Sequence, residues 1–209
     1  PLGIPIVHDL HGVGKNLSDH PFIFLTASVK DEVKLVELAP RLQVALRYTA
    51  SGSKYTNDMM MLMHSFSTDR YNSLRNNHRA SHLANPCIQI NVALYLAESR
   101  GEVTLTSTDP SVQPFLDFRL LESAEDRRRM REAIRIAADL LKHPDFASIV
   151  DERIEPLDSD LGSDDSLDEW ILREVTTGQH LTGTCKMGPD SDGSAVVDQF
   201  LKVHGIDGL

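Results

Sequence analysis

The 209 residues carry 21 Lys and Arg against 31 Asp and Glu, a formal net charge of −10, and 41% of them are hydrophobic. This composition is typical of one large or two small globular domains with a sizeable core, and it excludes a disordered chain. The acidic balance also argues against a nucleic-acid partner, because binding to phosphates needs a basic face.

No apolar run approaches the roughly 20 residues that cross a bilayer, so no membrane span is predicted. Two cysteines, Cys87 and Cys185, cannot make a disulfide framework, and no CxxC or paired Cys/His spacing indicates a zinc site. The chain begins at Pro1 without a methionine and ends at Leu209 within a turn-like stretch. We therefore expect a segment of a longer protein, and the sequence leaves its location open, with the cytoplasm as the default.

In chain order, Gly12 and Gly14 predict a turn after a short strand, and the β-rich run 22–29 predicts a strand. Residues 39–48 are expected to form a helix that ends at Gly52. The run 59–66 suits a buried strand or a short helix, and its length favours the strand. Apolar and polar residues then alternate over 88–97, which predicts a half-buried strand, and Arg100-Gly101 is expected to turn it back as a hairpin through 102–107.

A long amphipathic helix is predicted to begin at the cap Ser123, with Asp126 three residues later, and to stop at His143-Pro144. The arginines of 127–131 are expected on its solvated face. A second helix is predicted over 167–176. Strands joined by hairpins with helices grouped outside them favour an α+β fold, an antiparallel sheet packed against helices.

Two groups of residues resemble metal sites without completing one. Asp158, Asp160 and Glu169 have EF-hand spacing, but Ser163 stands where that loop requires glycine, so a solvated linker with a helix cap at Ser163 is the better interpretation. His78 and His82 lie four residues apart with no third ligand nearby, which favours surface histidines.

The stretch GQHLTGTCKMG at 178–188 has neither helical nor strand periodicity and predicts a shaped loop. A nucleophilic pair of Cys185 and His180 lacks an orienting third residue, so Cys185 is expected to be a small packed residue. A neutral imidazole with a pKa near 6.5 suits proton transfer, and His180 is a candidate for it. From this loop alone, a structural or an exposed role for the histidine stays open.

Four ordered matches extend this interpretation. GQHLTGTCKMGPDSDGSAVVDQFLKVHGIDGL resembles the C-terminal signature of the glucose-methanol-choline (GMC) flavin oxidoreductases. HDLHGVGKNLSDHP at 8–21 is similar to the DLPGVGxNLxDHP segment of that family. SRGEVTLTSTDPSVQP at 99–114 and the DRRRM helix match the next two segments. The resemblance spans nearly the whole chain, with a poor match over about 30–85.

The chain also departs from the family pattern. His11 and Leu181 stand where the family usually has proline, and neither change removes a reactive group. The GxGxxG motif for the dinucleotide lies upstream of these residues, and the second active-site His or Asn lies beyond Leu209. The resemblance therefore implies the substrate domain of a flavoenzyme, of the kind found at the C-terminus of FAD-linked reductases, with small edges of the flavin domain.

The resemblance implies that an alcohol loses its hydroxyl proton to His180 and its hydride to FAD, which residues outside this chain mainly bind. Asn16, Asp19 and His20 are the cofactor-binding candidates, although Asn16 and Asp19 also suit a turn. The implied division is 1–21 at the edge of the flavin domain, 22–180 for substrate binding, and 181–209 for the active-site loop and the return toward the flavin domain.

The implied partners are a small alcohol and the remainder of the same polypeptide, and the segment alone is expected to be inactive. A lyase that cleaves cyanohydrins and a non-catalytic binding or scaffold module are the alternatives.

Overall fold

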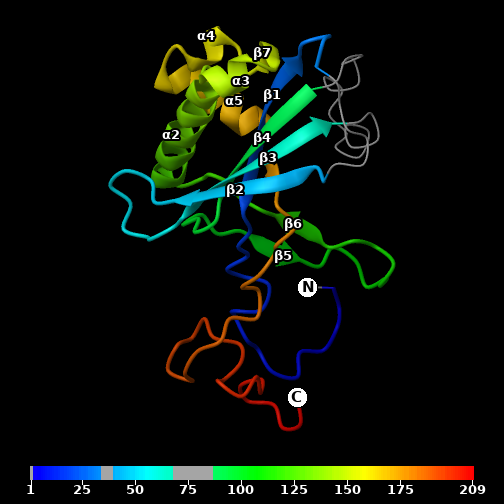
Figure 1. Ribbon diagram of the computed structural model, residues 1–209. Helices are drawn as coiled ribbons and strands as arrows, with labels where there is room; N and C mark the ends of the chain where they lie inside the picture. The colour runs from blue at the N-terminus through cyan, green and yellow to red at the C-terminus, as the bar shows by residue number, and fades with distance from the viewer. Residues whose placement is uncertain (1, 34–39, 68–86) are drawn as a thin grey trace.

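The computed structural model describes residues 2–33, 40–67 and 87–209, with the side chains of 65–67 left out. Its main element is a six-stranded antiparallel sheet of order β2-β3-β4-β1-β7, with β8 paired to β1 (Figure 1). The strands of this sheet are β1 (Pro21–Val29), β2 (Leu42–Tyr48), β3 (Met59–Ser67), β4 (Cys87–Leu94), β7 (Val150–Glu155) and β8 (Thr176–Thr177). A separate two-stranded ribbon consists of β5 (Glu102–Thr104) and β6 (Phe115–Asp117).

The helices gather on one side of this sheet (Figure 1). They are α2 (Ala124–Leu140), α3 (Pro144–Ala147), α4 (Asp158–Leu161) and α5 (Asp164–Glu174). Residues three or four apart on α2, such as Met130, Ala133 and Ala137, are buried in one core with Trp170 of α5 and Ile23 of β1. The predicted α+β fold is thus confirmed: an antiparallel sheet packed against helices. In the described part of the chain, no helix has the length and apolar character needed to span a membrane.

The prediction of a helix over 39–48 was wrong, since Leu42–Tyr48 forms the edge strand β2. Its backbone pairs with β3, with Tyr48 opposite Met59. The run contains helix formers, but ladder hydrogen bonds to a neighbouring strand outweigh such a weak local preference. The strands predicted over 22–29 and 59–66 are confirmed as β1 and β3.

The strand predicted over 88–97 exists as β4, but it ends at Leu94 and all eight of its residues are buried. The alternating polar residues do not face solvent: Gln89 and Asn91 are each 2% exposed. The expected hairpin with 102–107 was also wrong, because Val103 pairs with Leu116 of β6. Gly101 instead exchanges two backbone hydrogen bonds with Leu17, at 2.9 and 2.8 Å, which carries the chain away from β4.

The helix caps were predicted more accurately. The hydroxyl of Ser123 accepts hydrogen bonds from the backbone of Glu125 and Asp126, and it begins α2 as expected. Ser163 caps α5, which therefore starts before the predicted residue 167 and ends at Glu174. The turn at Gly12 and Gly14 is present, but no strand precedes it within residues 2–10. The candidates His78 and His82 lie outside the described residues.

One arginine of the run 127–131 corrects the expectation of a solvated face. Arg129 is fully buried, and its guanidinium donates to Asp58 at 2.7 Å and to Asp126 at 2.6 Å, two carboxylates that are also fully buried. It donates to the carbonyl of Leu96 as well, at 3.1 Å. The pairing joins α2 to the start of β3 and the end of β4. Periodicity missed it because the partner Asp58 is 71 residues away in sequence.

Replacement of Arg129 by Met is expected to lower the free energy of unfolding by about 3–5 kcal/mol, because it leaves two carboxylates buried without their cation. Urea unfolding followed by circular dichroism measures this loss. The matched control is Arg128→Ala, which removes a half-exposed arginine from the same helix and should cost less than about 1 kcal/mol. Equal losses for the two variants would contradict the assigned role of the buried cluster.

Candidate active site

Three backbone segments distant in sequence meet below the sheet, where the N-terminal and C-terminal parts of the chain run together (Figure 1). Leu17 pairs with Gly101 on one side. On the other side, Ser18 and Thr182 exchange backbone hydrogen bonds of 2.8 and 2.9 Å. Segment 14–20 therefore lies between the ribbon and the loop of His180, and it connects both to the start of β1.

The carboxylate of Asp19 organises this junction. One oxygen, Oδ1, accepts the backbone N–H of His20 at 2.7 Å and that of His180 at 2.9 Å. The other oxygen, Oδ2, accepts the hydroxyl of Thr177. Asp19 is only 5% exposed. A buried carboxylate needs such donors, and here they come from both sides of the site, so one side chain fixes the two histidines relative to each other.

The loop before and after His180 depends on close backbone approach. A Cβ at position 178 would lie 2.8 Å from the carbonyl oxygen of His20, and one at position 183 would lie 2.3 Å from that of Asn16. Gly183 also has φ of +93°, a conformation that side chains disfavour. Gln179, directly before His180, has φ of 62°, a left-handed conformation that residues other than glycine rarely adopt. The surrounding structure must hold such a conformation in place. Here the Thr177 hydroxyl accepts the backbone N–H of Gln179, and Asp19 accepts that of His180.

The imidazole of His180 is exposed and has aromatic neighbours. The ring of His20 lies edge-on to it, with centroids 5.2 Å apart, and the ring of Phe22 lies perpendicular to it at 6.1 Å. His20 in turn stacks on Tyr95, with centroids 4.2 Å apart. The guanidinium of Arg47 is 5.8 Å from the centroid of Tyr95. The site is thus a row of rings that ends in one accessible imidazole.

The two histidines differ in their electrostatic surroundings. Burial lowers the pKa of His20 below its usual value of 6.5, and the neighbouring His180 lowers it further, while Asp19 and a backbone hydrogen bond to Tyr95 act in the opposite direction. The net direction favours the neutral form of His20. A neutral ring beside His180 leaves room for a positive charge to develop on His180 without repulsion from its neighbour.

The structure brings together three of the four predicted site residues, Asp19, His20 and His180. The fourth, Asn16, has φ of 60° and donates from Nδ2 to the carbonyl of Gly183 at 3.2 Å, so it holds the far end of the same loop.

The expectation of a packed Cys185 was wrong, because this residue is exposed. Sequence reasoning missed three residues of the site, Phe22, Tyr95 and Thr177. For Thr177 a signal was available, because it is a polar residue directly before Gly178, where the loop begins.

The acidic residues with EF-hand spacing serve local structure. Asp160 accepts the backbone N–H of Leu157 at 2.7 Å, and Asp158 pairs with Arg153. Within the described residues no group of three or more His, Cys, Asp or Glu could hold a metal ion.

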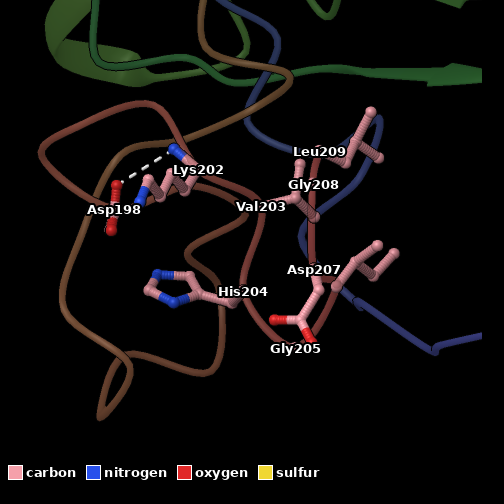
Figure 2. A pocket seen from close by; sticks show the side chains of 9 residues that line it. Asp198, Lys202, Val203, His204, Gly205, Asp207, Gly208 and Leu209 are labelled. Carbon is pink, nitrogen blue, oxygen red and sulfur yellow. Dashed lines mark hydrogen bonds between the residues drawn. The ribbon is translucent and has the colours of Figure 1, made fainter.

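A hollow lies in the C-terminal segment, and Figure 2 shows the residues that line it, among them Asp198, Lys202 and His204. Asp198 accepts the backbone N–H groups of Phe200 at 2.8 Å and Lys202 at 3.0 Å. The Nε2 atom of His204 is 3.0 Å from the carbonyl oxygen of Gly188. These polar groups hold the turns of the segment, so the candidate active site is the one at His180.

The family model described as GMC oxidoreductase matches residues 97–209, just over half of the chain. The chain belongs to the GMC oxidoreductase family.

Similar proteins agree with this assignment. An oxygen-dependent choline dehydrogenase of Chromohalobacter salexigens is 30% identical, with 99% of this chain and 39% of that protein covered. One from Cronobacter sakazakii is also 30% identical over the same shares. Among solved structures, the formate oxidase of Aspergillus oryzae has a TM-score of 0.80 at 23% identity, covering 98% of this chain and 43% of that one.

A pyridoxine 4-oxidase from Mesorbium loti likewise has a TM-score of 0.80, at 21% identity over 99% of this chain and 39% of that one. At such identities the two structures support the fold alone. The chain spans 39% of the length of the curated relatives that it matches.

The lowered pKa of His20 predicts how the stability of the protein depends on pH. The folded protein binds fewer protons at this residue than the unfolded chain does, so the free energy of unfolding falls as the pH drops below 6.5 toward the lowered pKa. His20→Phe keeps a ring against Tyr95 but cannot titrate. Thermal melts between about pH 7.5 and about pH 5 should show a smaller loss of stability for this variant than for the wild type. Identical pH profiles would contradict the assignment.

Proposed function

We propose that this chain is the substrate-binding portion of an FAD-dependent enzyme that oxidises the CH–OH group of an alcohol, with His180 as the proton acceptor. The observation that carries the proposal is the geometry at Asp19. Its carboxylate holds the backbone of His180 while leaving the imidazole exposed. A general base needs this combination of fixed position and free ring nitrogens.

The residues present fit a flavin beside His180. The ring of His180 is exposed, and Leu181 next to it is 43% exposed, so an imidazole and an apolar side chain are both available to a flat, partly apolar cofactor. Of the three candidates for cofactor contact, Asp19 and Asn16 use their side chains to hold the His180 loop. We therefore propose that they position the loop, that His20 borders the cofactor, and that residues outside this chain mainly bind the FAD.

FAD, when bound, supplies the acceptor for the hydride that leaves the alcohol carbon. The residues of this chain act on the proton: a ring nitrogen of His180 accepts it from the hydroxyl group. The neutral form of His20, which its lowered pKa favours, avoids repulsion with the imidazolium that results. The rings of Phe22 and His20 border that imidazole.

The proposed division follows from this role. Residues 22–180 contain the sheet and its helices and would bind the substrate, whereas 1–21 and 181–209 would face the flavin-binding part of the longer protein. Because the chain spans 39% of its relatives, we also propose that these residues alone do not oxidise alcohols.

Replacement of His180 by Ala in the full-length holoprotein should slow flavin reduction by an alcohol about a hundredfold to ten-thousandfold, the range for a positioned acid or base. Stopped-flow absorbance measures the reduction directly. His143→Ala, which removes an exposed histidine at the start of α3, is the control and should leave the rate unchanged. An unaltered rate of flavin reduction in His180→Ala would refute the role of His180. The proposed reaction itself would be refuted by a holoprotein that cleaves cyanohydrins but whose flavin no alcohol reduces.

A further inference from the structure

The loop of His180 begins where the sheet ends, at Thr177. Thr177 is the last residue of β8 and lies opposite Pro21 of β1. The next residue, Gly178, donates its backbone N–H to the carbonyl of His20 at 2.9 Å. Strand register therefore places Thr177, whereas His180 lies three residues later and outside any strand. The position of the imidazole depends on how firmly this short connection is held.

The hydroxyl of Thr177 makes two hydrogen bonds within this connection. It accepts the backbone N–H of Gln179 at 2.9 Å, a local turn typical of serine and threonine. It also donates to Oδ2 of Asp19, whose Oδ1 accepts the backbone N–H of His180 at 2.9 Å. A hydroxyl group can donate and accept at once. Thr177 therefore binds both the residue before His180 and the carboxylate that holds His180.

Gln179 is the residue that needs this support. Its φ of 62° is a conformation that residues with a side chain rarely adopt. If Gln179 relaxed to a negative φ, the chain after it would turn, and the Cα–Cβ bond of His180 would point in another direction. A shift of about 1 Å in a catalytic group can cost about a hundredfold in rate. The hydrogen bond from Gln179 to Thr177 opposes that relaxation.

The two threonines of β8 differ in what their hydroxyls do. Successive side chains of a strand point to opposite faces, so the hydroxyls of Thr176 and Thr177 lie on different sides of β8. Within the part of the chain that the structure describes, the hydroxyl of Thr176 forms no hydrogen bond. Threonine is branched at Cβ, which restricts its χ1 angle, so the direction of the Thr177 hydroxyl is well defined.

We infer, on the basis of the proposed function, that Thr177 is a positioning residue for proton transfer. Its hydroxyl transmits the position of β8 to the imidazole of His180 by fixing the backbone of Gln179 and the carboxylate of Asp19. Asp19 alone holds the N–H of His180 but not the backbone angle before it. Thr177 acts through His180, so it sets how fast the hydroxyl proton leaves the alcohol and not how tightly the alcohol binds.

The test is Thr177→Val in the full-length holoprotein, which keeps the branched shape and removes the hydroxyl. The probes are benzyl alcohol, n-butanol and choline, and the alcohol that reduces the wild-type flavin fastest is used. Stopped-flow absorbance gives the limiting rate of flavin reduction and the alcohol concentration at half that rate. The limiting rate should fall about tenfold to a hundredfold. The half-saturating concentration should change by less than about threefold, because an interaction that serves only the transition state is lost.

Two further variants separate positioning from damage. Thr177→Ser restores a hydroxyl that can donate and accept, and its limiting rate should lie within about threefold of the wild type. Thr176→Val is the matched control, because it removes the neighbouring hydroxyl from the same strand. It should leave both kinetic values unchanged.

A second readout does not involve the flavin. In Thr177→Val, amide hydrogen exchange should become about tenfold faster at Gln179, which has lost its acceptor. Exchange at Gly178 should change little, since its acceptor is the carbonyl of His20. Equal exchange at Gln179 in the wild type and in the variant overturns the inference, because the Thr177 hydroxyl then does not hold the loop.

The kinetic outcomes decide the rest. A wild-type limiting rate in Thr177→Val overturns the inference alone. A Thr177→Ser variant as slow as Thr177→Val, or a slow Thr177→Val variant that binds less flavin, also overturns it, because either result indicates general damage to the structure. If none of the three alcohols reduces the wild-type flavin, the proposed function fails and this inference fails with it.

Discussion

The candidate site depends on one buried carboxylate that links two distant segments. Asp19 accepts the backbone N–H groups of His20 and His180 and the hydroxyl of Thr177, residues that lie up to 161 positions away in sequence. Charge-assisted hydrogen bonds of this kind are stronger than neutral ones, and an unpaired carboxylate at this depth would be costly. The loop therefore adopts the conformation that satisfies Asp19, and the exposed imidazole of His180 is a consequence.

The two faces of the sheet have separate tasks. The face toward α2 and α5 contains the apolar core, with the buried Arg129 bound to Asp58 and Asp126 at its margin. That cluster joins the helix to the start of β3 and the end of β4. The other face carries Phe22, whose ring centroid lies 6.1 Å from that of His180. His180 itself lies in a loop, and its backbone hydrogen bond to Asp19 attaches that loop to the segment that leads into β1.

Much of the fold could be predicted from local signals. The caps Ser123 and Ser163, the strands β1 and β3, and the α+β class all follow from side-chain chemistry and periodicity close in sequence. The errors share a cause. Edge strand β2, the ribbon partner of β5 and the burial of Arg129 are each decided by residues far away in sequence, such as Met59, Leu116 and Asp58. Pairing at long range overrides local propensity.

For the site, sequence reasoning selected Asp19, His20 and His180 without a reason for them to meet. Only the structure shows that the carboxylate of Asp19 binds both histidine backbones. The aromatic neighbours Phe22 and Tyr95 could not be predicted, because ring contacts depend on strand register and on the φ angles of the loop. The charge of Arg47 beside Tyr95 was hidden for the same reason, since the strand that carries it was expected to be a helix.

Amide hydrogen exchange tests most directly whether Asp19 fixes His180. In the full-length protein, Asp19→Ala should speed exchange at the His180 amide roughly tenfold to a hundredfold, as expected for loss of a hydrogen bond to a charged acceptor. Asp192→Ala removes a carboxylate that binds Lys186 further along the C-terminal segment, and it should leave this amide unchanged. Exchange at His180 that is equally slow in the wild type and in Asp19→Ala would contradict the account.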